Sequence, residues 1–159
     1  MMYFLNDLIH NPLILSSAAA WVVAQGLKLT IEFVLTGEFH IDRITGAGGM
    51  PSSHSATVCA LVVSTGIVYG AGGFELPMSF FFAFIVMYDA MGVRRETGEQ
   101  SKILNEMVQQ WFQKGDQLQS IDPMTQLKEF VGHTPLQVFI GGAIGCIIAV
   151  IVCMVMGYL

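Results

Sequence analysis

Charged side chains are scarce in this sequence. Only 12% of its 159 residues are Asp, Glu, Lys or Arg, whereas soluble globular domains carry about 25%. Hydrophobic residues make up 53% of the chain, and the mean hydropathy is +0.61. The chain is therefore too apolar for a soluble domain, and its hydrophobic segments must contact lipid or one another. At this length we expect a single membrane-embedded domain comprising residues 1–159.

Basic residues and cysteines are also few. The 7 Lys and Arg residues against 12 Asp and Glu give a net charge of −5, and the only basic pair is Arg94 and Arg95. This balance argues against a nucleic-acid partner.

The three cysteines, Cys59, Cys146 and Cys153, lack metal-ligand spacing and lie in apolar segments, so we interpret them as small buried hydrophobic residues. The sequence has no histidine and carboxylate cluster at ligand spacing, and we expect no metal or other cofactor.

Four hydrophobic segments are long enough to cross a bilayer. A membrane-spanning helix needs roughly 20 mostly apolar residues, and such segments occur at 12–35, 53–69, 77–93 and 135–158. Residues 1–11 contain Asp7 and no Lys or Arg, so we expect no cleavable signal peptide. The sequence therefore predicts an all-α, polytopic membrane protein with about four transmembrane helices.

The longest polar segment, residues 94–134, separates the third and fourth hydrophobic segments. Apolar residues recur at helical spacing in its first half: Ile103, Leu104, Met107, Val108, Trp111 and Phe112. This pattern predicts an amphipathic helix at the membrane interface. A soluble helix folded over the spans is equally compatible with it.

Almost all ionisable residues fall on one predicted face of the membrane. With four spans, the end of the first, the start of the second, the end of the third and the start of the fourth share a side. That side holds all 7 Lys and Arg residues and includes Lys28, Arg43, His54, Asp89, Arg94, Arg95 and His133. The positive-inside rule makes it cytoplasmic and leaves both termini on the opposite side, at the plasma membrane of a prokaryote. If Lys28, Arg43, Arg94 and Arg95 are functional, only Lys102, Lys114 and Lys128 remain as independent evidence for this orientation.

A glycine-rich segment, 46–49, leads into the second span through Ser52 and Ser53. Serine is a favourable helix N-cap, and the free backbone N–H groups of a helix N-terminus bind phosphate with help from the helix dipole. A flexible loop followed by an ordinary N-cap explains the same residues. A second histidine motif begins at Gly132 and His133, before the glycine-containing fourth span.

These two motifs together resemble the type 2 phosphatidic acid phosphatase superfamily, which includes vanadium haloperoxidases, and specifically its short divergent membrane branch. Residues 51–54 read Pro-Ser-Ser-His and match the superfamily's Pro-Ser-Gly-His except for Ser53 at the glycine position. His133 matches the histidine of another motif, in which Gln137 occupies the aspartate position and the preceding Ser-Arg pair is missing. The segment 89–95 resembles the branch's own signature, and its arginines could supply the missing guanidinium.

The resemblance implies chemistry in which one imidazole attacks phosphorus and a second protonates the leaving alkoxide. It implies that His133 is the nucleophile and His54 the acid. The implied phosphate-binding residues are Lys28, Arg43, Ser52, Ser53, Arg94 and Arg95, although 14 residues separate Lys28 from Arg43, more than in the superfamily's first motif. Gln137 is a supporting residue that can orient His133, and for Asp89 we favour a salt bridge over a catalytic role.

The expected function is a membrane phosphatase that hydrolyses a lipid-linked phosphomonoester or pyrophosphate through a phosphohistidine intermediate. Its expected partners are membrane lipids and a phosphorylated lipid or small phosphate substrate, with homo-oligomers left open. Because a neutral amide at Gln137 cannot replace a carboxylate in stabilising an imidazolium, a non-catalytic protein that binds anionic lipid or regulates a partner is the alternative. A transporter would be expected to show internal repeats or broken helices, and neither is evident.

Overall fold

The computed structural model describes residues 2–37, 48–113, 127 and 132–159, and within these residues it contains helices and no strands. The helices, in chain order, are α1 (Met2–Ile9), α2 (Pro12–Thr36), α4 (Ser53–Tyr69), α5 (Glu75–Met91), α6 (Val93–Gln113) and α7 (Pro135–Val155). The all-α fold expected from the sequence is confirmed. The predicted spans correspond to α2, α4, α5 and α7, whereas the short helix α1 was not predicted.

Three helical segments are long and apolar enough to cross a membrane. They are α2, the combined stretch of α5 and α6, and α7, while α4 is apolar but shorter, with 17 residues. The α7 helix ends at Val155 and not at residue 158, because the chain turns at Gly157, which has a φ of 80°. The described residues therefore form a helical membrane protein, as the hydropathy of the sequence predicts.

The ends of α2 show how local sequence sets the helix boundaries. Asn11 caps its start, because the Asn11 side chain accepts hydrogen bonds from the backbone N–H of Leu13 (2.9 Å) and of Ile14 (3.4 Å). Pro12 follows in the first helical turn, where its missing N–H costs nothing. The helix ends at Gly37, whose φ of 73° is readily adopted only by a residue without a Cβ.

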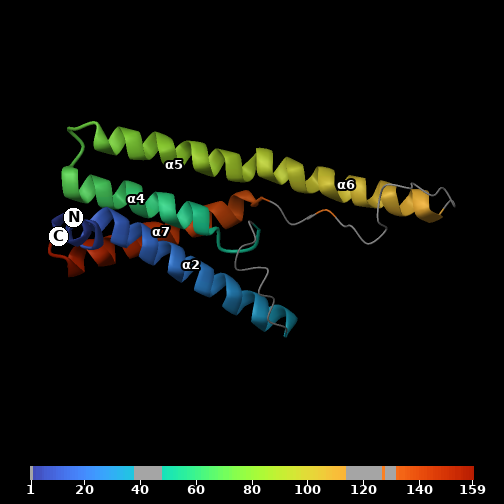
Figure 1. The fold of residues 1–159 in the computed structure, drawn as a ribbon, viewed down its shortest axis with the longest axis horizontal. Coiled ribbons are helices and arrows are strands. Elements are labelled where there is room, and N and C mark those ends of the chain that lie inside the picture. Colours follow the sequence, from blue (N-terminus) through green and yellow to red (C-terminus); the bar gives the residue numbers. More distant parts are fainter. Residues whose placement is uncertain (1, 38–47, 114–126, 128–131) are drawn as a thin grey trace.

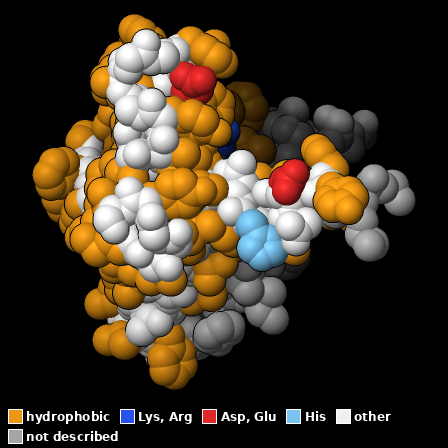
Figure 2. Space-filling model, turned by 90° about the vertical axis from the view of Figure 1, so that its left-hand side faces the viewer, with side chains coloured by type: hydrophobic (Ala, Val, Ile, Leu, Met, Phe, Trp, Pro, Cys, Tyr) orange, Lys and Arg blue, Asp and Glu red, His pale blue; other side chains and the backbone are white. Residues whose placement is uncertain are grey.

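The α4 helix lies at the centre of the bundle and packs against α2, α5 and α7. Both termini lie at one end of the bundle, together with the end of α4 and the start of α5 (Figure 1). The opposite end, which we call the polar end, brings together the end of α2, the start of α4, the end of α5 and the start of α7. Figure 2 shows that the end with the termini presents mainly hydrophobic and uncharged side chains.

Two glycines allow α7 to lie directly against α4. A Cβ on Gly141 would collide with the backbone carbonyl of Ser52, and a Cβ on Gly145 would collide with that of Ala56. Small residues at a four-residue spacing permit this close approach between membrane helices. The buried core beside this contact is built from alanines: Ala20, Ala24, Ala56, Ala60 and Ala149.

The α6 helix continues almost in line with α5 and extends past the polar end (Figure 1). The junction is Gly92, whose φ of −96° and ψ of −94° depart from helical values. The helix predicted in the polar segment is therefore present, but it does not fold back over the spans. Its apolar residues Ile103, Leu104, Met107 and Trp111 are exposed, and Asn105 exchanges two hydrogen bonds with the backbone of Leu127, of 2.9 and 3.0 Å.

Candidate functional site

Two histidines from distant parts of the chain meet at the polar end. His54 lies in the first turn of α4 and His133 lies just before α7, with ring centroids 6.0 Å apart. Only 3% of the His133 surface is exposed. Nε2 of His133 and Nδ1 of His54 are buried and make no well-formed hydrogen bond to any described residue. Buried polar atoms are normally paired, so two open imidazole nitrogens side by side are typical of a site that receives a ligand.

Backbone hydrogen bonds hold this histidine pair in place. The N–H of His133 donates to the carbonyl of Ala90 at 3.0 Å, and the N–H of Ser52 donates to the carbonyl of Gln137 at 3.2 Å. The first bond ties His133 to the end of α5, and the second ties the start of α4 to α7. Gly132, with a φ of 93°, passes so close to the α6 backbone that a Cβ would collide with the N of Arg95. Three spans thus position the two rings through main-chain contacts.

Gln137 determines which nitrogen of His133 carries the proton. Its Oε1 accepts a hydrogen bond from the backbone N–H of Thr134 at 3.0 Å and lies 3.3 Å from Nδ1 of His133. A backbone N–H can only donate, so the Thr134 contact identifies this atom as the amide oxygen and not the nitrogen. A hydrogen bond between these two atoms requires a proton on Nδ1 of His133, and in that neutral tautomer Nε2 carries a lone pair.

Burial lowers the pKa of His133 from its ordinary value of 6.5, because a buried imidazolium loses hydration. The hydrogen bond to Gln137 opposes this shift. The nearby His54 and Lys28 lower the pKa further, and the backbone of Gly49 acts in the same direction as Gln137. The net effect is that His133 remains neutral at neutral pH.

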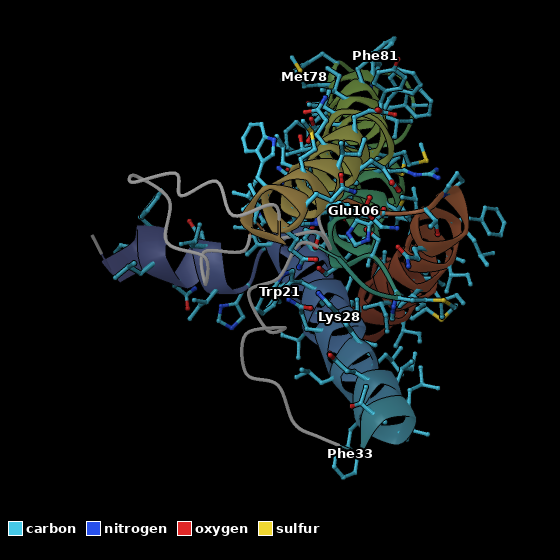
Figure 3. The ribbon with its side chains drawn as sticks, turned by 90° about the vertical axis from the view of Figure 1, so that its right-hand side faces the viewer. Trp21, Lys28, Phe33, Met78, Phe81 and Glu106 are labelled. Carbon is cyan, nitrogen blue, oxygen red and sulfur yellow. The ribbon has the colours of Figure 1, made fainter. Side chains whose placement is uncertain are left out.

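Lys28 brings a buried cation to the histidine pair. The residue is only 4% exposed, and its Cε lies 3.0 Å from the point that a Cβ on Gly49 would occupy. Its charge acts on both His54 and His133. Figure 3 shows Lys28 lying toward the middle of the bundle, whereas Phe33, farther along α2, lies at the periphery. The glycine at position 49 leaves room for the lysine stem to reach the site.

Arg94 is the second cation near the pair. Its Nε donates to Oδ2 of Asp89 at 2.7 Å, and the two side chains are 45% and 41% exposed. The salt bridge expected for Asp89 is thus confirmed. The charges of both residues act on His54. The side chain of Arg95 is exposed, and no described contact brings it to the histidines.

The remaining predicted residues divide into two groups. Arg43 lies outside the described residues. Ser52 and Ser53 are buried at the start of α4, where the Ser52 hydroxyl oxygen caps the helix by accepting from the backbone N–H (3.4 Å) and the hydroxyl (3.0 Å) of Ser55. The capping role suggested by the sequence is therefore present, and a phosphate-binding role for the two serines stays a prediction.

One local signal was available in the sequence and was missed. Thr134 and Gln137 have the Ser/Thr-x-x-Glu/Gln spacing of a capping box, with Pro135 in the first helical turn, and the structure has this cap at the start of α7. Recognising it would have fixed both the first residue of α7 and the position of Gln137 beside His133. The carbonyl of Ala90, by contrast, has no signature in the sequence.

This arrangement defines a class of protein: a helical membrane protein with a histidine pair and cations at one end of its bundle. The chain belongs to the Divergent PAP2 family, whose model matches residues 9–148. It is 35% identical over 151 residues to "Uncharacterized membrane protein YuiD" of Bacillus subtilis (strain 168), an alignment that covers 91% of this chain and 96% of that relative. No solved structure matches the chain. The resemblance to the divergent membrane branch is thus confirmed.

Proposed function

We propose that this chain is a membrane phosphatase that hydrolyses a lipid-linked phosphomonoester or pyrophosphate. The observation that carries the proposal is the environment of His133: its Nδ1 lies 3.3 Å from Oε1 of Gln137, its buried Nε2 has no side-chain partner among the described residues, and its ring contacts that of His54. A neutral imidazole held in this tautomer is a competent nucleophile. The His54 ring lies 6.0 Å from the His133 ring between centroids, so both imidazoles are placed at the same site.

In the proposed reaction, the Nε2 lone pair of His133 attacks phosphorus. The N–P bond forms as the bond to the leaving oxygen breaks, and His54 donates its proton to that oxygen. Water then attacks the phosphohistidine, His54 accepts a proton from it, and the N–P bond breaks to release phosphate. His133 returns to its starting state, so protons and electron pairs balance over the cycle.

The cations of the site would stabilise the phosphoryl oxygens. The proposal is supported by the charge of Lys28, which acts on both histidines, and by that of Arg94, which acts on His54; fixed donors of this kind act strongly where water is excluded. Arg43, Arg95, Ser52 and Ser53 belong to the proposed phosphate site by family resemblance. We further propose that this end of the bundle faces the cytoplasm at the plasma membrane, because the Lys and Arg residues are expected on that side.

Phosphate release by the purified protein in lipid nanodiscs tests this proposal. We expect His133→Ala and His54→Ala each to reduce the rate at least about 100-fold, the usual contribution of a nucleophile or general acid. His10→Ala is the matched control, because His10 is exposed beside α1, at the opposite end of the bundle. Equal rates in all four proteins would contradict the proposal.

Gln137 favours one alternative, a protein that binds an anionic lipid headgroup without turnover. A neutral amide accepts a hydrogen bond from the imidazolium that forms on phosphoryl transfer, but it does not neutralise its charge. The alternative predicts that wild-type protein binds vanadate or phosphatidic acid and releases no phosphate. It also predicts that this binding survives in His133→Ala. The phosphatase proposal predicts instead that a phosphohistidine intermediate can be trapped in the wild-type protein and not in that variant.

A further inference from the structure

An apolar groove of about 620 Å³ opens on the side of the bundle between α5 and α7. Cys59 of α4 forms part of its floor, Phe84 and Met87 line it from α5, and Val138 and Ala143 line it from α7. Its lining is hydrophobic throughout, and its volume is in the range of sites that hold small-molecule ligands.

The groove reaches residues next in sequence to the histidine site, and neither histidine lines it. Met91 and Pro135 line it; Met91 follows Ala90, whose carbonyl binds the His133 backbone, and Pro135 is two residues from His133. Cys146 also lines the groove, eleven residues farther along α7. At about 1.5 Å per residue the lining extends roughly 16 Å along the helix, which is about half of a hydrocarbon core roughly 30 Å thick.

From this continuity we propose that the groove holds one hydrocarbon chain of the phosphorylated lipid whose phosphate lies at the histidine pair. The inference rests on the proposed function and names the substrate class: a lipid with a long chain attached close to its phosphate. The walls of the groove are membrane-spanning helices, where the surrounding solvent is hydrocarbon and contains no water. Its end at Met91 and Pro135 lies next in sequence to Ala90 and two residues from His133, so a hydrocarbon chain that enters sideways from the bilayer would bring its own headgroup toward His133.

The hydrocarbon chain of the substrate would contribute to positioning the phosphate more than to the affinity of the lipid for the protein. Lipid tails are about as apolar as the side chains of the groove, so moving a chain from the bilayer into it releases little hydrophobic free energy. Aligning the phosphorus with Nε2 of His133, in contrast, can change a rate by orders of magnitude. Loss of the groove should therefore reduce hydrolysis of long-chain substrates and leave a chainless phosphate ester unaffected.

Filling the groove tests the proposal. Ala143 is an exposed residue of α7 that lines the groove, so Ala143→Trp places a bulky ring there without entering the α4–α7 contact. Ala18→Trp is the matched control, because Ala18 is an exposed alanine of α2 that lines a different apolar surface, between α2 and α4. Both variants are assayed in nanodiscs with dipalmitoyl phosphatidic acid and with p-nitrophenyl phosphate.

We expect Ala143→Trp to reduce long-chain hydrolysis at least about tenfold, with less than about a twofold change for p-nitrophenyl phosphate, as expected when a substrate loses its alignment. Ala18→Trp should change neither rate by more than about twofold. Equal rates of long-chain hydrolysis in the two variants would contradict the proposed role of the groove, without contradicting the phosphatase activity.

A binding readout separates the two proposals where there is no hydrolysis. Phosphatidic acid with a photoreactive diazirine near the end of one chain is crosslinked to wild type, His133→Ala and Ala143→Trp in nanodiscs, and the labelled peptides are identified by mass spectrometry. We expect labelling around Phe84 and Cys146 in the first two proteins and its loss in the third. This labelling pattern without phosphate release would contradict the phosphatase activity and support binding of a hydrocarbon chain in the groove. Labelling spread evenly over the lipid-facing helices would contradict that binding.

Discussion

Oε1 of Gln137 lies 3.3 Å from Nδ1 of His133. The same oxygen caps α7 through the backbone N–H of Thr134, so one side chain both begins a membrane helix and selects the histidine tautomer. The arrangement couples the geometry of the proposed nucleophile to the start of the helix that follows it. It also makes position 137 the most informative one to change.

Gln137→Glu is expected to accelerate hydrolysis. Glutamate preserves the capping-box pattern, and its negative charge stabilises the imidazolium that forms when His133 attacks phosphorus. The carboxylate also raises the pKa of His133, so the acid limb of the pH–rate profile should move to higher pH. Rates of phosphate release measured across pH check both effects, with Gln137→Leu as the control that removes the hydrogen bond. A glutamate variant no faster than the leucine variant would contradict this role for residue 137.

In the proposed reaction, the wild-type protein should remain active below pH 6.5. Burial lowers the pKa of His133 from that ordinary value, and the reaction requires the neutral ring, which is lost only when the pH falls through the lowered pKa. The acid limb of kcat/KM, which reports the free enzyme, should therefore lie on the acidic side of 6.5. An acid limb above 6.5 would show that the group limiting the rate is not a buried His133.

Arg94→Ala should reduce activity far more than stability. Its ion pair with Asp89 is nearly half exposed, and exposed pairs contribute about 0–1 kcal/mol. Loss of a guanidinium beside the reacting phosphoryl group should cost roughly 10- to 100-fold in kcat/KM. Thermal unfolding and phosphate release are measured in parallel, with Lys102→Ala on α6 as the control for loss of a basic residue. A large decrease in melting temperature with unchanged kinetics would make Arg94 a structural residue.

Gly145→Ala is expected to destabilise the bundle by about 1–3 kcal/mol, the usual cost of overpacking. The added Cβ would collide with the backbone carbonyl of Ala56, and a main-chain atom cannot move aside as a flexible side chain can. Gly26→Ala is the matched control, because a Cβ there meets no atom within 4 Å and alanine is the better helix former. Unfolding of both variants in the same detergent compares them. Similar stability for the two would refute the close α4–α7 contact.

The orientation in the membrane can be tested by cysteine labelling. In a background without native cysteines, Glu106→Cys on α6 should react with a membrane-impermeant maleimide only after the cells are permeabilised. Tyr3→Cys, near the N-terminus at the opposite end, should react in intact cells, because the basic end is expected to face the cytoplasm. The reverse pattern would place the histidine pair outside the cytoplasm.

The sequence predicts much of this architecture, because membrane helices are set by local hydropathy. The alternation of four spans was enough to bring His54 and His133 to one end, although 78 residues separate them. The four-residue spacing of Gly141 and Gly145 does not by itself predict the close approach of α7 to α4, since such spacings are common in apolar helices and their partners are not encoded locally. The structure supplies those partners, the carbonyls of Ser52 and Ala56.

Other features could not be read from residue types. The direction of α6 depends on the backbone angles at Gly92, and a glycine is compatible with a sharp turn or with the near-continuous path observed. The bond between His133 and Ala90 uses a main-chain carbonyl that every residue possesses. For Arg94, the sequence offered two neighbouring arginines, and only three-dimensional placement distinguishes the one whose charge acts on His54.

Two of the hydrogen bonds that frame the histidine pair come from the main chain alone. Neither the bond from His133 to Ala90 nor that from Ser52 to Gln137 requires a particular side chain at its acceptor residue. Mutational drift around the site can therefore replace serines, arginines or an aspartate while the two rings keep their spacing. A chain of this architecture can therefore keep its two histidine rings in place after neighbouring residues of the superfamily's motifs have changed.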